Sequence, residues 1–103
     1  MTKLLNLIAI IAAILALTVQ AKGTLSDNIR IESKVLNYAL QYRVYTPEGI
    51  KDSDKLPTLY IADGQWYIGA GNMAEVLDAE ISAGHIKPII AIFVDNRNPD
   101  DLS

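Results

Sequence analysis

The sequence predicts an α/β protein in which an antiparallel strand pair precedes one parallel strand–helix–strand unit. Three patterns indicate this architecture. Residues 38–45 alternate between apolar and polar side chains, which is typical of a half-buried strand. Residues 58–62 and 89–94 are short, continuously apolar runs, as expected of parallel strands that are covered on both faces. Between these two runs, apolar residues recur at helical spacing.

The antiparallel pair comes first along the chain. A strand over residues 29–35 is expected to pair with the strand over 38–45, because only Leu36 and Asn37 separate them. The polar residues 22–28 in front of the pair are expected to form a flexible lead-in.

The parallel unit follows. Pro57 and Pro88 lie just before its two strands, where a missing N–H costs least. Asn72 is expected to cap the intervening helix, with Glu75 completing a capping box, and Gly84 is expected to end it in the left-handed conformation. The residues expected on the buried face of this helix are Met73, Val76, Leu77 and Ile81.

The composition excludes several classes of protein. Half of the 103 residues are apolar, 20% are charged and none is cysteine, which rules out disulfide scaffolds, iron–sulfur proteins and cysteine-based zinc sites. The net charge of −3 offers no basic patch, so no nucleic-acid partner is expected.

Residues 1–21 have the layout of a secretory signal peptide. Lys3 supplies a positive charge, residues 4–19 are apolar at all but two positions, and Ala21 provides a small residue before a cut. A helix over the apolar run would reach about 24 Å, short of the roughly 30 Å of a bilayer core. We therefore expect an exported, periplasmic or secreted protein with no stable membrane anchor after cleavage; the alternative is a retained anchor.

The remaining domain, residues 22–103, is expected to be incomplete. Two strands that are apolar on both faces need cover on both faces, and the sequence offers one helix. The sequence therefore predicts the N-terminal part of a larger α/β fold, truncated soon after the second parallel strand. Apolar surface or an unpaired strand edge should be exposed.

Two loops follow the carboxyl ends of the predicted parallel strands, where open α/β sheets bind ligands. The first begins with Asp63 and Gly64, and the second contains Asn96 and Arg97. Main-chain N–H groups in the first loop could hold an oxyanion. Asp-Gly is also a common turn dipeptide, and on the residues alone a simple turn is the more frequent outcome.

Three segments carry a family resemblance. They read R-V-Y-x-P at residues 43–47, L-P-x-L-Y-x-x-D-G-Q-W at 56–66 and K-P-x-I-x-x-x-V-D-N at 87–96. With them, residues 30–98 resemble the N-terminal third of the putative esterase family of α/β-hydrolases, which includes enterochelin esterase-like enzymes, feruloyl esterases and S-formylglutathione hydrolases. The resemblance implies hydrolysis of a small-molecule carboxylic ester through an acyl-serine intermediate, without a metal or organic cofactor. It also favours the oxyanion loop over the simple turn.

The resemblance assigns roles to individual residues. In α/β-hydrolases one oxyanion-hole amide comes from the loop after the third strand. That amide corresponds to the main-chain N–H of Gln65, with Gly64 letting the backbone approach and Asp63 fixing the turn. The residues expected to surround the substrate are Asp63, Trp66, Asn96 and Arg97.

The catalytic residues of the family have no counterpart in the sequence. None of the serines lies in a G-x-S-x-G elbow, which holds the nucleophile in α/β-hydrolases. The single histidine, His85, is expected at the amino ends of the parallel strands, away from the oxyanion loop. The chain alone is therefore expected to be inactive. The alternative function is that of a small exported, non-catalytic binding or interaction protein derived from the same fold.

Two further interpretations concern other residues. Asp95, Asp100 and Asp101 lie in one segment, but a solvated loop is expected there because an oxygen-ligand metal site needs several convergent groups. Tyr38 and Tyr42 share a strand face and could stack on a ligand, although packing against other side chains is the expected role.

Overall fold

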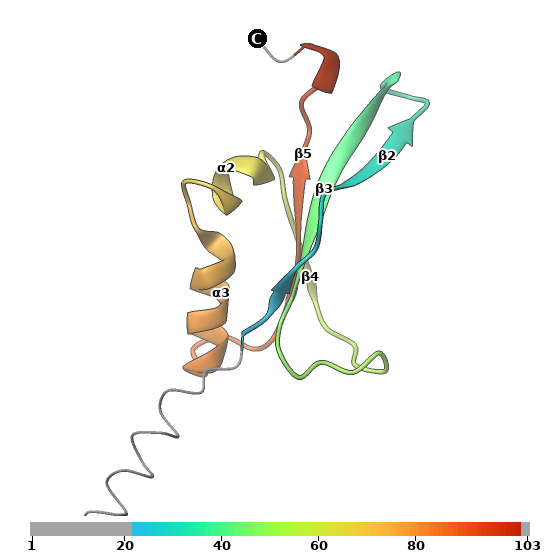
Figure 1. The fold of residues 1–103 in the computed structure, drawn as a ribbon. Coiled ribbons are helices and arrows are strands. Elements are labelled where there is room, and N and C mark those ends of the chain that lie inside the picture. Colours follow the sequence, from blue (N-terminus) through green and yellow to red (C-terminus); the bar gives the residue numbers. More distant parts are fainter. Residues whose placement is uncertain (1–21, 102–103) are drawn as a thin grey trace, which may run out of the picture.

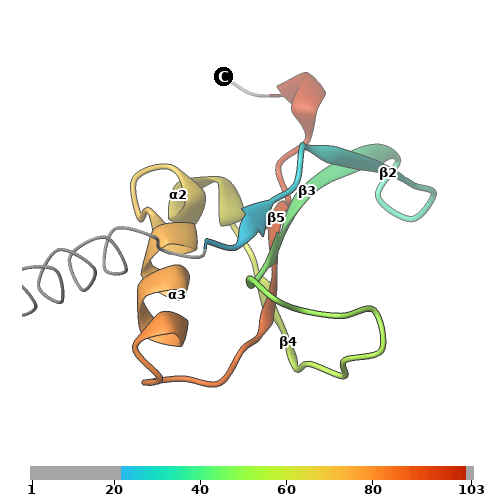
Figure 2. The same cartoon turned by 60° about the horizontal axis from the view of Figure 1, so that its bottom comes forward.

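A computed structural model describes residues 22–101; the expected signal peptide, residues 1–21, lies outside them. Along the chain the elements are β1 (Thr24–Leu25), β2 (Ile29–Ser33), β3 (Tyr38–Thr46), β4 (Thr58–Ile61), α2 (Gly64–Ile68), α3 (Met73–Ser82), β5 (Ile90–Asp95) and the 3-10 turn η1 (Pro99–Asp101). The strands form one mixed sheet, and α2 and α3 lie on the same side of it (Figures 1 and 2). Within residues 22–101, no helix combines the length and apolarity needed to cross a membrane.

The predicted antiparallel pair is confirmed. β2 pairs with β3 from Ile29 opposite Tyr42 to Ser33 opposite Tyr38. Asn37 completes the connecting turn in the left-handed conformation, at φ 61°, and its N–H donates to the carbonyl of Ser33. Asparagine tolerates this conformation better than most residues do, which explains its place in so short a connection.

The prediction of a flexible lead-in at residues 22–28 was wrong. β1 lies inside that segment and pairs antiparallel with the end of β3, Thr24 opposite Thr46 and Leu25 opposite Tyr45. The Leu25 side chain packs against the core. A two-residue strand carries no detectable alternation, so long-range pairing rather than local pattern determines this element.

The parallel unit is also confirmed. β4 and β5 pair in parallel, and the chain crosses between them through α2 and α3. β5 also pairs antiparallel with β3, so the order across the sheet is β1-β3-β5-β4, with β2 beside the other end of β3. β4 is therefore an edge strand among the described residues.

The ends of α3 agree with the prediction only in part. The helix starts after Asn72, and Gly84 follows it at φ 74°, as predicted. The capping box was wrong, because Asn72 is itself left-handed, at φ 49°, and makes no side-chain bond to the helix backbone. Its side-chain amide instead donates to the Glu75 carboxylate at 2.7 Å.

The core lies between the sheet and the two helices. Its buried members are Tyr45, Ile61, Leu77, Ala91 and Phe93. The predicted buried face of the helix was wrong at one position, because Val76 is 51% exposed. Asp78 takes a place facing the sheet instead, where it accepts a hydrogen bond from Tyr45.

The opposite face of the sheet carries no helix within residues 22–101 (Figures 1 and 2). Tyr60 points to this face from β4 and is 71% exposed. The expectation of exposed apolar surface is therefore confirmed, because the second face of this apolar strand lacks the cover that it needs.

Candidate functional site

The segment after β4 forms a short helix rather than the loop that the sequence suggested. Asp63 is left-handed, at φ 53°, and α2 starts at the next residue. The first hydrogen bond of the turn runs from the Trp66 N–H to the Asp63 carbonyl at 3.0 Å. The helix therefore begins directly at the carboxyl end of β4, where α/β sheets bind ligands.

Asn96 anchors this turn to the neighbouring strand end. The main-chain N–H of Asp63 donates to Oδ1 of Asn96 at 2.9 Å. The carbonyl of Asn96 in turn accepts a hydrogen bond from the Tyr38 hydroxyl at 3.2 Å. The structure thus brings together two of the predicted site residues, Asp63 and Asn96.

Gly64 is required by close packing. A Cβ atom at this position would lie 2.6 Å from both the backbone and the side chain of Phe93 in β5. No real side chain tolerates such a distance, so only glycine lets the start of α2 rest on β5. Gly64 therefore holds the start of α2 close to the sheet.

Gln65 occupies the second position of α2, and its main-chain N–H has no hydrogen-bond acceptor within residues 22–101. The first N–H groups of any helix lack partners inside the helix and carry a partial positive charge. This donor is therefore available to an anion or an oxyanion.

The Gln65 side chain has a different environment. Both its Nε2 and its Oε1 are buried, and neither has a partner among the described residues. A buried polar group without a hydrogen bond costs about 1–3 kcal/mol. Within residues 22–101, the hydrogen-bonding capacity of the Gln65 amide is therefore left unmet.

The other two predicted site residues are Trp66 and Arg97. Trp66, in the middle of α2, is 63% exposed and leaves an apolar surface open to solvent. Arg97 is engaged elsewhere: its Nε and Nη2 both donate to the Asp95 carboxylate at 2.8 Å. These hydrogen bonds hold the pKa of Asp95 below its usual value.

His85 is placed as predicted, in the connection that leads into β5. Its Nδ1 contacts the Glu80 carboxylate at 2.9 Å, and both side chains are exposed. Within residues 22–101, no three histidine, aspartate or glutamate side chains converge as a metal ion would need. The three aspartates at 95, 100 and 101 therefore form no such group.

Two features of this region are not predicted by the sequence patterns. One is α2 itself, because five residues are too few for a helical period to show. The other is the ion pair between Arg97 and Asp95. Two oppositely charged residues two positions apart at the end of a strand could have suggested it.

Comparison with protein-family models matches residues 33–102 to the family described as putative esterase. The chain belongs to this family. A search of curated protein sequences finds no match.

Solved esterases show the same fold over part of their length. A ferulic acid esterase matches with a TM-score of 0.63 and 20% identity, over 74% of this chain and 31% of that one. The enterobactin esterase from Shigella flexneri, with enterobactin, matches with a TM-score of 0.65 and 17% identity, over 79% and 21% of the two chains. The feruloyl esterase module from Clostridium thermocellum matches with a TM-score of 0.59 and 18% identity, over 69% and 26%.

These likenesses establish the fold. The antiparallel pair and the parallel unit correspond to part of an α/β-hydrolase esterase, and the chain spans between 21% and 31% of the lengths of these three structures. This confirms the fold class that the sequence predicted.

Proposed function

We propose that the chain supplies the oxyanion loop of an exported serine esterase that hydrolyses carboxylic esters. The observation that carries this proposal is the unpartnered main-chain N–H of Gln65 at the carboxyl end of β4. Membership of the esterase family supports the reaction class.

In such an enzyme a serine attacks the ester carbonyl, and the carbonyl oxygen becomes an oxyanion held by two N–H donors. The N–H of Gln65 is one donor. The second donor, the serine, the acid and the histidine lie in sequence that residues 1–103 do not contain. Collapse of the tetrahedral intermediate releases the alcohol and leaves an acyl-serine, which water then hydrolyses to the free acid.

The surrounding contacts fix the donor before the substrate arrives. The Asp63–Asn96 hydrogen bond ties the turn to the end of β5, and the contact between Gly64 and Phe93 prevents it from lifting off the sheet. A donor that needs no reorganisation during the reaction stabilises the oxyanion more than a mobile one does. Trp66 provides an apolar wall beside it.

The proposed cellular location follows from residues 1–21. Their charged start, apolar run and small residue at Ala21 support cleavage and export. The proposed enzyme therefore acts in the periplasm or outside the cell, and its substrate is a small-molecule ester.

The experiment uses the polypeptide encoded by the complete open reading frame that contains these residues. Gln65→Pro removes the N–H, and proline fits the first turn of a helix. Gln65→Ala keeps the N–H and serves as the matched control. Loss of one oxyanion donor typically lowers kcat about 10²–10³-fold, which we expect for Gln65→Pro with p-nitrophenyl esters. Equal kcat values for the two variants would remove Gln65 from the oxyanion site.

The chain of residues 22–103 alone provides the complementary test. Without nucleophile and general base, one donor gives negligible catalysis, so we expect no turnover of a p-nitrophenyl ester above the buffer rate. Turnover that Gly64→Pro abolishes would show that this chain is catalytic by itself and would overturn this part of the proposal.

A further inference from the structure

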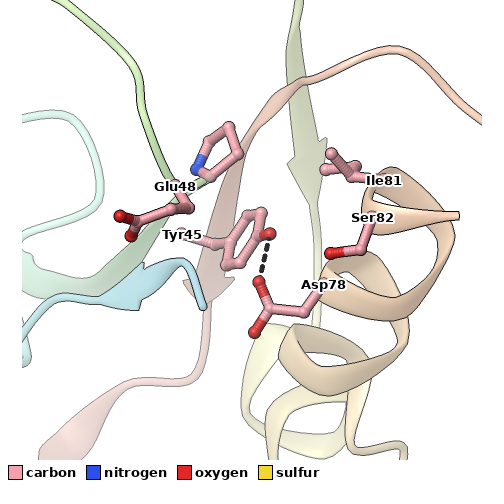
Figure 3. A pocket seen from close by; sticks show the side chains of 6 residues that line it. Tyr45, Glu48, Asp78, Ile81 and Ser82 are labelled. Carbon is pink, nitrogen blue, oxygen red and sulfur yellow. Dashed lines mark hydrogen bonds between the residues drawn. The ribbon is translucent and has the colours of Figure 1, made fainter. Parts of the chain in front are cut away.

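Asp78 on α3 is half-buried and accepts two hydrogen bonds on one oxygen. Its Oδ1 accepts from the Tyr45 hydroxyl at 2.7 Å and from the main-chain N–H of Gly23 at 2.9 Å (Figure 3 shows the first). Burial of Tyr45, followed by its bond to Asp78, raises the pKa of the phenol, so the hydroxyl remains a donor. Within residues 22–101, no cationic side chain forms an ion pair with Asp78.

Gly23 is fixed at this carboxylate by close packing as well as by its hydrogen bond. A Cβ atom on Gly23 would lie 2.6 Å from the Thr46 carbonyl oxygen, 2.7 Å from the Tyr45 ring and 2.9 Å from Oδ1 of Asp78. The pairing of β1 with β3 continues this attachment at the next residue. The backbone just before Gly23 therefore has a defined position beside Asp78.

A small pocket adjoins the same carboxylate. Its volume is about 210 Å³. The residues that line it are Tyr45, Pro47, Glu48, Asp78, Ile81 and Ser82 (Figure 3). No cationic side chain lines it, and Asp78 is the carboxylate that faces Tyr45, whereas Glu48 is exposed and its carboxylate points away from Asp78 (Figure 3).

We propose that the Asp78 carboxylate binds the α-ammonium group of Lys22, which cleavage after Ala21 creates. Water adds across the Ala21–Lys22 amide bond, leaving a carboxylate on Ala21 and an amine on Lys22 that takes up a proton at neutral pH. The new group belongs to the residue directly before Gly23. The Gly23 nitrogen lies 2.9 Å from Oδ1 of Asp78 and one residue of chain spans at most about 3.6 Å, so the new group lies within about 7 Å of that oxygen.

Cleavage thus supplies the cation that this half-buried carboxylate lacks. In the uncleaved chain the same position is a neutral amide N–H. After cleavage, the ion pair joins the hydrogen bond of Gly23 and the strand pairing of β1 in holding the start of the mature chain on α3 and β3. The inference rests on the proposed export, because cleavage at Ala21 is part of that proposal.

The experiment expresses the full-length chain in a bacterial host and purifies the exported product. Intact mass first identifies its N-terminus, and we expect Lys22. The product is then treated near pH 7 with a limiting amine-reactive ester, and modification of the Lys22 α-amine is followed by peptide mass. Only the neutral amine reacts, so an ion pair that favours the ammonium by one pKa unit slows the reaction roughly tenfold.

Asp78→Asn removes the charge, and Glu80→Gln removes an exposed charge from the same helix as the matched control. We expect the α-amine to react roughly tenfold faster in Asp78→Asn than in the wild type, with Glu80→Gln unchanged. If Asp78→Asn does not fold, the native wild type is compared with the same chain in urea, which should show the fast rate. Equal rates in the native and the urea-treated wild type would overturn the inference.

The two proposals can fail separately. A product that retains residues 1–21 contradicts export and cleavage. A chain released at Lys22 from a cleavable fusion then tests the ammonium site by the same rates, and slow modification of its α-amine would support the site without export.

Discussion

On the face of the sheet that carries α2 and α3, Ala91, Tyr45 and Phe93 are between 0% and 1% exposed. On the opposite face, Tyr60 is 71% exposed. Residues paired across β4, β5 and β3 form rows that alternate between the two faces. Leu59, Ala91 and Tyr45 form one row, and the next row, on the opposite face, consists of Tyr60, Ile92 and Val44. Both rows are apolar, yet only the first contains fully buried residues, Ala91 and Tyr45.

Strand composition thus indicates the cover that a strand needs, and not the cover that a given stretch of chain provides. Residues 22–101 contain helices for one face only. A contiguous exposed apolar patch on a soluble protein usually marks a contact surface. The uncovered face therefore agrees with a chain that spans a minor share of the esterases it matches.

The largest difference between the two faces is expected from side-chain truncation. Phe93→Ala should lower the free energy of unfolding by about 3–5 kcal/mol, because it leaves a cavity under α2. Tyr60→Ala should change it by about 0.5 kcal/mol or less, because the ring is already in solvent. Urea denaturation followed by circular dichroism measures both. Similar losses for the two variants would show that the exposed face is covered in solution.

The contact between α2 and the sheet gives the next largest effect. Gly64→Ala should cost about 1–3 kcal/mol of stability, since the added methyl group meets Phe93 and the helix must shift. Gly84→Ala meets no atom within 4 Å and should cost about 1 kcal/mol through its positive φ alone. Thermal unfolding of the two variants measures the difference, and a neutral Gly64→Ala would refute the close approach.

The Gln65 side chain should produce a change of opposite sign. Gln65→Met has a similar length and removes a buried amide without partners, so we expect a gain of about 1 kcal/mol in stability. The main-chain N–H is retained. A loss of stability, measured by the same urea titration, would mean that the amide has a hydrogen-bond partner in solution.

The smallest effect concerns the rim of the covered face, where Arg97 holds the pKa of Asp95 below its ordinary value. A lowered folded-state pKa contributes stability above the unfolded pKa of about 3.9, and this is lost as pH falls through the folded value. Arg97→Gln should therefore be slightly less stable than the parent at pH 7. The difference should vanish as the pH falls below about 4, as thermal unfolding across pH would show; a constant difference would contradict the assignment.

Sequence patterns predicted most of the fold because those patterns are local. The alternation in residues 38–45, the apolar runs at 58–62 and 89–94, and Gly84 after the helix each reflect a backbone requirement within a few residues. The family motifs likewise identified the turn at Asp63 and Gly64 as the candidate site.

The remaining features depend on contacts between distant residues. β1 exists because Thr24 meets Thr46, and Asp78 faces the sheet because Tyr45 and Gly23 donate to it. No window of sequence contains both partners. The anchoring of Asp63 by Asn96 spans 33 residues for the same reason.

The most direct test of the central claim is the nucleotide sequence downstream of the codon for Ser103. We expect an open frame that encodes a G-x-S-x-G elbow, then an acidic residue and a histidine, together with helices to cover the face that carries Tyr60. A stop codon followed by unrelated sequence would contradict it, and the alternative of a small exported binding protein would then take its place.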